Sequence, residues 1–249
     1  MCNINLVLNK GKALSLLPSM YMNVASMTSW KGNNHGEGMI GFRNKHINVY
    51  KSINKRIYRQ MYWFLATHQR YATSGKRDAQ TSHPYESSHF YLMHNGIFSG
   101  LGDREKSDTM VYLEMLEEAY VANNLNLMKA LNDVHSKVGG FYSIVLYVKG
   151  TGKVYYYKNN SASMYGIQNK EWLILSTSED NINYARRFFK IGGKMVFEEN
   201  IVYDLRDSMR VVGKITTKVR EPEPEPEYEP KPKDDFQKKV YNYYGNRWF

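Results

Sequence analysis

The stretch MCNINLV (residues 1–7) holds Cys2, which is the only cysteine among the 249 residues of the chain. A lone cysteine usually serves as a small hydrophobic residue in a core. Chain ends are rarely well packed, so that role does not suit position 2. Removal of Met1 would leave a thiol and a free α-amino group on one residue. Cys2 is therefore the first candidate for a chemical role.

The composition argues against several classes of protein. No run approaches the ~20 apolar residues of a membrane-spanning helix, and residues 1–30 lack the pattern of a signal peptide. One cysteine allows neither an intrachain disulfide nor a cysteine-based metal site, and the seven histidines show no metal-binding spacing. We therefore expect a cytoplasmic protein that has no membrane partner and binds no metal or other cofactor.

The net charge of +10 raises nucleic acid as a candidate partner. Residues 220–249 carry six basic and seven acidic side chains, so residues 1–219 hold a net charge of +11. These basic residues are scattered and form no dense run. We therefore favour an ordinary solvated surface over nucleic-acid binding.

The end of the sequence differs from the rest in composition. Five of the seven prolines lie within EPEPEPEYEPKPK, residues 221–233, and alternating Glu-Pro favours an extended spacer because proline lacks a backbone donor. We expect a globular domain over 1–219, a linker over 220–233 and an aromatic and basic tail over 234–249. Such a tail suits docking onto a partner protein. Packing on its own domain and stacking on single-stranded nucleic acid are the alternatives.

Residues 1–219 combine strand and helix patterns. Apolar periodicity predicts helices over about 107–123, 126–137 and 178–190, with Ser107 as the N-cap of the first. Many strands with few helices, which come late, indicate an α+β sheet sandwich and not a doubly wound parallel sheet. Aromatic and β-branched stretches predict strands over 3–8, 38–43, 47–52, 62–70, 90–95, 139–148, 153–159 and 171–178.

Four short segments, far apart in the sequence, supply complementary chemical groups. They are MCN (1–3), THQRYATSG (67–75), HNG (94–96) and SDT (107–109). Together they contain a thiol, a cation, a donor pair beside a glycine, and an anion. These groups are what is needed to hold a zwitterionic amino acid and to attack its side-chain carbonyl.

In this order the segments resemble a class II glutamine amidotransferase domain, which has the N-terminal-nucleophile hydrolase fold. The family begins its mature chain with cysteine and then carries HxRxAT-x-G, an HP pair, HNG and an S/T-D step. Here the matching segments are 68–75, 83–84, 94–96 and 107–108, and the resemblance spans about residues 2–200. Each motif alone is weak, but the ordered set is specific. It implies an α+β fold of four layers, an αββα sandwich.

The resemblance implies a catalytic role for three residues. Cys2, exposed by loss of Met1, would attack the side-chain amide of glutamine and form a thioester. An α-amino group has a pKa near ~7.7–8.0 and can accept the thiol proton, so no histidine base is required. The side-chain amide of Asn95 and the backbone N–H of Gly96 would stabilise the oxyanion. Asn95-Gly96 is also a common hairpin-turn dipeptide.

The resemblance assigns the two ends of the substrate to other residues. Arg70 would bind the α-carboxylate of glutamine with its planar guanidinium, and Asp108 would bind the α-ammonium group. An acidic residue at the start of a helix is also favoured by the helix dipole alone. Thr73 is expected to add a further substrate contact.

The sequence departs from the family pattern at three places. Tyr71 stands where many members have Trp, Ser74 stands where many have His, and NNHGEG (33–38) lacks the arginine of the family's HRG element. These changes leave the nucleophile and the oxyanion residues intact. They alter the contacts that close the pocket over glutamine.

The sequence therefore predicts a stand-alone enzyme that hydrolyses glutamine and supplies ammonia to a separate acceptor enzyme. Two alternatives stay open. One is an N-terminal-nucleophile amidohydrolase that cleaves a γ-glutamyl or related amide, which Arg70 and Asp108 speak against. The other is a non-catalytic binding or structural protein on the same fold, which the intact set of Cys2, Asn95 and Gly96 speaks against.

Overall fold

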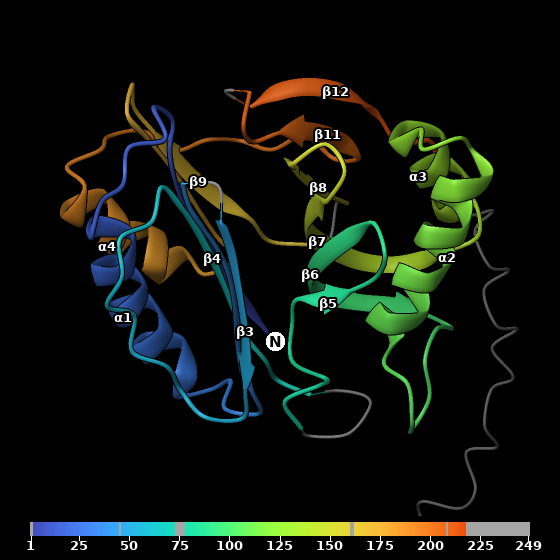
Figure 1. Ribbon diagram of the computed structural model, residues 1–249, viewed down its shortest axis with the longest axis horizontal. Coiled ribbons are helices and arrows are strands. Elements are labelled where there is room, and N and C mark those ends of the chain that lie inside the picture. Colours follow the sequence, from blue (N-terminus) through green and yellow to red (C-terminus); the bar gives the residue numbers. More distant parts are fainter. Residues whose placement is uncertain (1, 45, 73–77, 160–161, 208, 218–249) are drawn as a thin grey trace, which may run out of the picture. The chain divides into compact units, whose positions relative to one another are not determined.

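Two six-stranded antiparallel sheets form the centre of the fold in the computed structural model (Figure 1), which describes residues 2–44, 46–72, 78–159, 162–207 and 209–217. The first sheet has the order β3-β2-β4-β1-β10-β9. Its strands are β1 (Asn3–Asn9), β2 (Glu37–Arg43), β3 (His46–Ser52), β4 (Phe64–Gln69), β9 (Tyr165–Gln168) and β10 (Trp172–Ser176).

The second sheet has the order β12-β11-β8-β7-β6-β5. Its long central strands, β6 and β7, pair in register over ten residues each. The strands of this sheet are β5 (Tyr85–Glu86), β6 (Phe90–Ser99), β7 (Gly139–Val148), β8 (Lys153–Lys158), β11 (Ile201–Asp204) and β12 (Arg210–Lys214).

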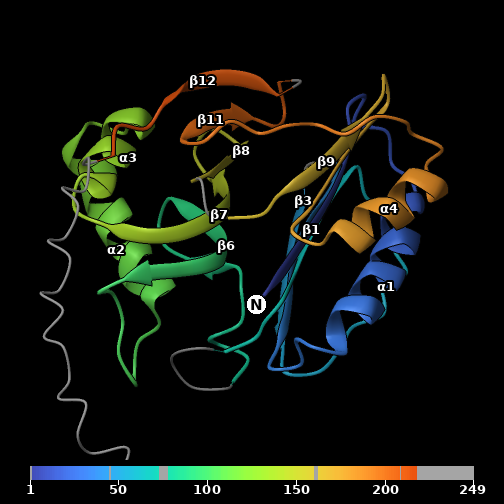
Figure 2. The same cartoon turned by 180° about the vertical axis from the view of Figure 1, so that it is seen from behind.

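The helices of the described residues form the two outer layers. Helices α1 (Leu17–Trp30) and α4 (Glu179–Phe188) cover the outer face of the first sheet. Helices α2 (Asp108–Ala122) and α3 (Leu127–His135) cover the second sheet, and Figure 2 shows the same layers from behind. The predicted αββα sandwich is confirmed.

Three apolar clusters hold the layers together. One lies between the sheets and joins Ile4, Leu6 and Phe64 of the first sheet to Val145 and Tyr156 of the second. A second packs α2 and α3 on their sheet, and a third packs α1 and α4 on theirs. Successive side chains of β1 point to opposite faces of the sheet, so this strand contributes to two of the clusters. Ile4 and Leu6 face the other sheet, whereas Val7 faces α1 and α4.

Most predicted elements are present, with one clear error. The eight predicted strands and the helices α2, α3 and α4 are confirmed, and Ser107 caps α2 by accepting a hydrogen bond from the Met110 N–H. The expectation that the helices come late is wrong, because α1 follows β1 directly. The short strands β5, β9, β11 and β12 also escaped prediction.

The end of the chain is not described beyond residue 217. The predicted linker (220–233) and tail (234–249) lie outside the described residues, and their boundaries stay predictions. Within the described part of the chain, no helix has the length and apolar character that crossing a membrane requires.

Strand pairing brings the ends of three strands to one edge of the first sheet. Asn3, the first residue of β1, pairs with Gln69, the last residue of β4, and Glu37, the first residue of β2, pairs with Gln69 from the other side. Cys2 and Arg70 are the next residues along their strands. They therefore emerge together at this edge.

Gly38, in β2 next to this edge, allows the backbone of His83 to lie directly against the strand. A Cβ atom on Gly38 would lie 1.4 Å from the backbone oxygen of His83. We expect Gly38→Ala to lower the free energy of unfolding by about 2–3 kcal/mol, because backbone must move to make room. Gly150→Ala, where a Cβ would meet no atom within 4 Å, is the control, with an expected change within about 0.5 kcal/mol. Urea unfolding measures both, and equal effects would contradict this close contact.

Candidate active site

Cys2 precedes β1, and its thiol contacts the backbone of Tyr71. The Tyr71 N–H donates to Sγ at 3.2 Å, and the thiol donates to the Tyr71 carbonyl oxygen at 3.4 Å. Burial raises the pKa of the Cys2 thiol above its usual value, an effect that the Tyr71 hydrogen bond and the charge of Arg70 offset only in part. The thiol is therefore protonated at neutral pH and needs a base to become a nucleophile.

Arg70 follows β4 and is 4% exposed. Its Nη1 donates a hydrogen bond to Oγ1 of Thr81 at 3.0 Å. Burial raises the pKa of both Cys2 and Asp108, and the positive charge of Arg70 offsets part of each rise, so the guanidinium lies near both the thiol and the carboxyl group. A buried guanidinium in this position suits an anionic group of a ligand.

Asp108 is the first residue of α2, and its carboxylate is held by backbone donors. Oδ2 accepts a hydrogen bond from the Phe98 N–H at 2.9 Å, and Oδ1 accepts one from the Thr109 N–H at 2.8 Å. Burial raises the pKa of the Asp108 carboxyl, and these hydrogen bonds offset part of the rise. A carboxylate fixed in this way has lone pairs left for a cationic group.

Four of the predicted site residues border one narrow cavity of about 20 Å³: Cys2, Arg70, Gly96 and Asp108. The thiol, the guanidinium, the carboxyl group and the glycine backbone thus meet at one place, although they come from separate parts of the sequence. A cavity of this size holds about one water molecule. Glutamine can enter only if the cavity widens.

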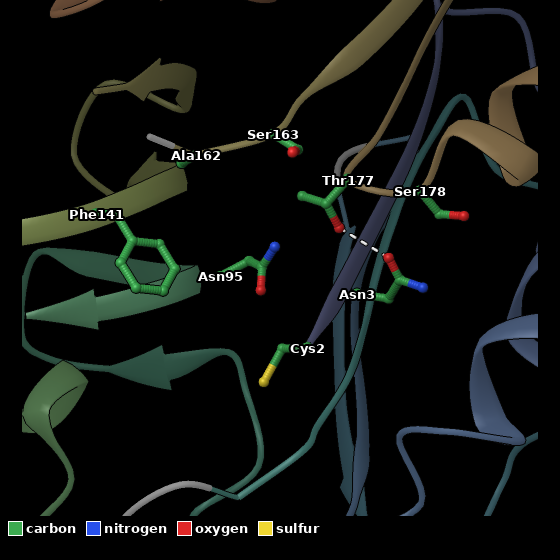
Figure 3. Close-up of a pocket in the computed structure, with 8 residues that line it drawn as sticks. All are labelled: Cys2, Asn3, Asn95, Phe141, Ala162, Ser163, Thr177 and Ser178. Atoms are coloured by element: carbon green, nitrogen blue, oxygen red, sulfur yellow. Dashed lines mark hydrogen bonds between the residues drawn. The ribbon is translucent and has the colours of Figure 1, made fainter. Parts of the chain in front are cut away.

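A second cavity of about 240 Å³ lies on the other side of Cys2 (Figure 3). Asn95, the fifth predicted residue, extends from β6 into it, and Cys2 borders both cavities. The remaining lining has no ionisable side chain and comprises Asn3, Phe141, Ala162, Ser163, Thr177 and Ser178.

Asn95 and Gly96 lie inside a strand and not in a hairpin turn. They pair with Ser143 and Tyr142 of β7. Gly96 has a φ of +148°, and a Cβ there would lie 1.9 Å from the Phe141 carbonyl oxygen, so no other residue fits. The Asn95 side chain is 7% exposed, and its Oδ1 has no hydrogen-bond partner among the described residues. This oxygen can therefore accept a hydrogen bond from a ligand.

Two of the departures from the family pattern contact each other. The ring of Tyr71 stacks on His35 at a centroid distance of 5.0 Å, and the Ala72 N–H donates to Nδ1 of His35 at 2.9 Å. These contacts tie the segment after Arg70 to the turn before β2. Thr73, the sixth predicted site residue, lies outside the described residues, as does Ser74.

Three histidines at the site are buried and uncharged, and two of them, His83 and His94, line the narrow cavity. Nε2 of His68 lies 3.0 Å from the His94 carbonyl oxygen, and the rings of His68 and His83 lie 3.9 Å apart. Burial lowers the pKa of His68 and of His94 to about 3, and it lowers that of His83 well below its usual value. Neutral imidazoles of such low pKa are weak general bases at pH 7.

Sequence reasoning missed a buried amide network behind Cys2 and Arg70. Asn5 donates from Nδ2 to Oε1 of Gln69 at 3.1 Å, and Gln69 donates from Nε2 to Oε1 of Glu37 at 3.1 Å. Asn3 donates from Nδ2 to Oγ of Ser29 in α1 at 2.8 Å. The signal was available, because asparagines at positions 3 and 5 of an apolar strand share one face.

The described residues show no group of His, Cys, Asp and Glu arranged to hold a metal ion. The groups that border the two cavities include a thiol, a cation, an anion and an amide. This set suits acyl transfer from a small zwitterion.

No protein-family model and no curated protein matches the chain. Solved structures are similar to it, among them the following two. Glutamine phosphoribosylpyrophosphate amidotransferase from B. subtilis, complexed with ADP and GMP, is 13% identical, with a TM-score of 0.62 over 86% of this chain and 49% of that chain. The allosteric regulatory enzyme of purine biosynthesis is 14% identical, with a TM-score of 0.57 over 84% of this chain and 48% of that chain.

This chain has the fold of a class II glutamine amidotransferase domain. The resemblance seen in the sequence is thereby confirmed at the level of the fold. The chain spans about half the length of each of these two proteins. The likeness therefore concerns the αββα sandwich.

The buried histidines of this amidotransferase fold make stability depend on pH. In the unfolded chain their pKa is about 6.5. Below that pH the unfolded chain binds protons that the folded chain does not. The free energy of unfolding should therefore fall by about 1.4 kcal/mol per pH unit for each such histidine as the pH drops from about 6.5 to about 5.

Urea unfolding across this pH range measures the effect. His68→Gln should reduce the slope of the free energy of unfolding against pH by the contribution of one histidine, about 1.4 kcal/mol per pH unit. His46→Gln, on the exposed start of β3, should leave this slope unchanged. A wild-type profile that is flat between about pH 6.5 and about pH 5 would show that these histidines are not buried as neutral groups.

Proposed function

We propose that this chain hydrolyses glutamine to glutamate and ammonia through a thioester on Cys2. The observation that carries the proposal is the meeting of Cys2, Arg70, Gly96 and Asp108 around one cavity. A cation and an anion flanking a thiol match the free amino-acid end of glutamine. A larger γ-glutamyl compound carries the same α-carboxylate and α-ammonium group, so these two charges favour a glutamyl side-chain amide in general, and glutamine is its smallest example.

The first step needs a base for the Cys2 thiol. Burial raises the pKa of this thiol, and the nearby histidines are held neutral with a low pKa. The α-amino group of Cys2 itself, set free by removal of Met1, is the base in this proposal, because its pKa of about 7.7–8.0 suits proton transfer at neutral pH.

Arg70 and Asp108 orient the substrate. Arg70 binds the α-carboxylate through its planar fork of donors, and Asp108 binds the α-ammonium group. Thr73 completes the set with a further contact, as the sequence predicts. The cavity must widen to admit glutamine, and substrate binding supplies the energy for that change.

The chemistry then follows in two steps. The thiolate attacks the amide carbon, and the side-chain amide of Asn95 and the N–H of Gly96 stabilise the oxyanion. The C–N bond breaks, and ammonia leaves with the proton that the α-amino group had taken from the thiol. Water then attacks the thioester, glutamate is released, and the thiol is restored.

We propose that a separate enzyme uses the ammonia. Glutamine phosphoribosylpyrophosphate amidotransferase is named for two substrates, and this chain matches 49% of it. The described residues are accounted for by one αββα sandwich. The tail (234–249), which lies outside the described residues, is our candidate for docking onto that enzyme in the cytoplasm.

Cys2 and its α-amino group can be tested together. Cys2→Ala should abolish glutamate release from glutamine while leaving the free energy of unfolding within about 1 kcal/mol of wild type. Intact-mass analysis of active protein should show that Met1 is absent. Full activity in Cys2→Ala, or in protein that retains Met1, would rule out this mechanism.

Substrate binding and oxyanion stabilisation should separate in steady-state kinetics. Arg70→Lys should raise KM, because the bidentate contact with the α-carboxylate is lost. Asn95→Ala should lower kcat by about two to three powers of ten, because an oxyanion donor is lost.

Arg187→Lys, on the exposed side of α4, is the matched control for the arginine and should change neither constant. If Asn95→Ala raised KM and left kcat intact, Asn95 would be a binding residue and not an oxyanion donor.

A further inference from the structure

Helix α1 has an apolar outer face. Leu17, Met20, Val24 and Met27 are 36%, 52%, 37% and 58% exposed, whereas Tyr21 on the inner face is fully buried. The helix contains no Asp, Glu, Lys or Arg. A helix in the outer layer of a fold normally carries polar residues on its solvent side. A continuous apolar face of this kind marks an interaction site.

A neighbouring segment widens this face. Asn23 donates from Nδ2 to the Tyr58 carbonyl oxygen at 2.9 Å, and the Tyr58 N–H donates to Oδ1 of Asn23 at 2.8 Å. These bonds hold the chain before β4 along the flank of α1. They bring up Ile57 and Met61, which are 61% and 42% exposed. The α1 patch is defined as Leu17, Met20, Val24, Met27, Ile57 and Met61.

The spacing of the α1 residues indicates what the patch contacts. Positions 17, 20, 24 and 27 are separated by three, four and three residues, which is the a/d spacing of a helix that packs along another helix. The flanking residues Asn23 and Thr28 are uncharged. The partner surface is therefore a second apolar helix, and no charge on α1 needs compensation.

We propose that α1 packs against α1 of a second copy of this chain, antiparallel and about a two-fold axis. Like surfaces then meet without burying a charge, and each helix N-terminus lies beside the partner's C-terminus, as the helix dipoles favour. A patch of this kind measures on the order of 300–600 Å². Two copies bury roughly 600–1,200 Å², at the lower edge of a specific interface, so the dimer is weak.

The charges around the α1 patch predict a different salt dependence for this dimer than for a complex with an acidic partner. Residues 1–77 contain twelve basic residues and one acidic residue, Glu37, which is fully buried. Lys31 directly follows α1 and Arg59 lies between Ile57 and Met61 in the sequence, and both are exposed. Exposed Glu179 and Asp180 at the start of α4 also lie beside α1, because Asn181 bonds to Tyr21 and Ser29. The surroundings of the patch therefore carry both signs of charge, and added salt should change the dimer little. An acidic partner would be weakened by salt.

Sedimentation velocity of the full chain tests the proposal. We expect a monomer–dimer equilibrium with a Kd in the range of about 1–100 µM, which should change by less than about threefold between about 0.05 M and about 0.5 M salt. Met20→Glu should raise the Kd at least tenfold, because the interface would bury an unpaired charge. Val196→Glu, at an 89% exposed position between α4 and β11, is the matched control and should leave the Kd unchanged.

A monomer at every concentration would overturn the proposal, and so would a dimer that Met20→Glu leaves intact. Cross-linking tests the antiparallel arrangement, in which position 20 of one copy faces position 24 of the other. Met20→Cys combined with Val24→Cys, in a Cys2→Ala background, should form a disulfide-linked dimer on oxidation. A dimer that persists without this cross-link would overturn the α1 pairing. None of these measurements uses activity, so their outcome is independent of the glutaminase proposal.

Discussion

The antiparallel pairing of β1 with β4, in which Asn3 lies opposite Gln69, is the constraint on which the site depends. It makes Cys2 and Arg70 neighbours although 67 residues separate them in the chain. A shift of one residue would turn the amides of Asn3 and Asn5 toward the other sheet and move Ile4 and Leu6 out of the central core. The amide network and the core therefore fix the same register from opposite faces of β1.

Burial of the ionisable groups at the site determines which of them can accept or donate a proton at neutral pH. The same burial that raises the pKa of the Cys2 thiol lowers the pKa of His68, His83 and His94. Side chains that could accept the thiol proton are thus held in their neutral, weakly basic form. This explains physically why the proposed mechanism assigns the base to an α-amino group next to the thiol. In the proposed mechanism, removal of Met1 is therefore required for activity.

The sequence predicted the fold and most of the site because these features depend on local patterns. Ser107 and the periodicity after it located α2, and stretches of aromatic and β-branched residues located β1 and β4. Helix α1 was missed because apolar residues lie on both its faces, so no one-sided periodicity exists. That failure coincides with the surface proposed for dimerisation, where a polar outer face is absent.

The ordered motifs predicted residues that the fold brings together at the candidate site, but their geometry could not be read from the sequence. The sequence could not give the width of the cavity between Arg70 and Asp108, because packing of distant side chains sets it. Nor could it show that Cys2 borders two cavities, with Gly96 on one and Asn95 on the other.

The central claim is that Cys2 forms a thioester with the glutamyl group. Rapid mixing with glutamine, acid quenching and mass analysis of the peptide that carries Cys2 test it directly. The account predicts one glutamyl group on Cys2, present only in protein that lacks Met1. Steady glutamate release without any glutamyl adduct on Cys2, with the adduct on another residue, would contradict the account.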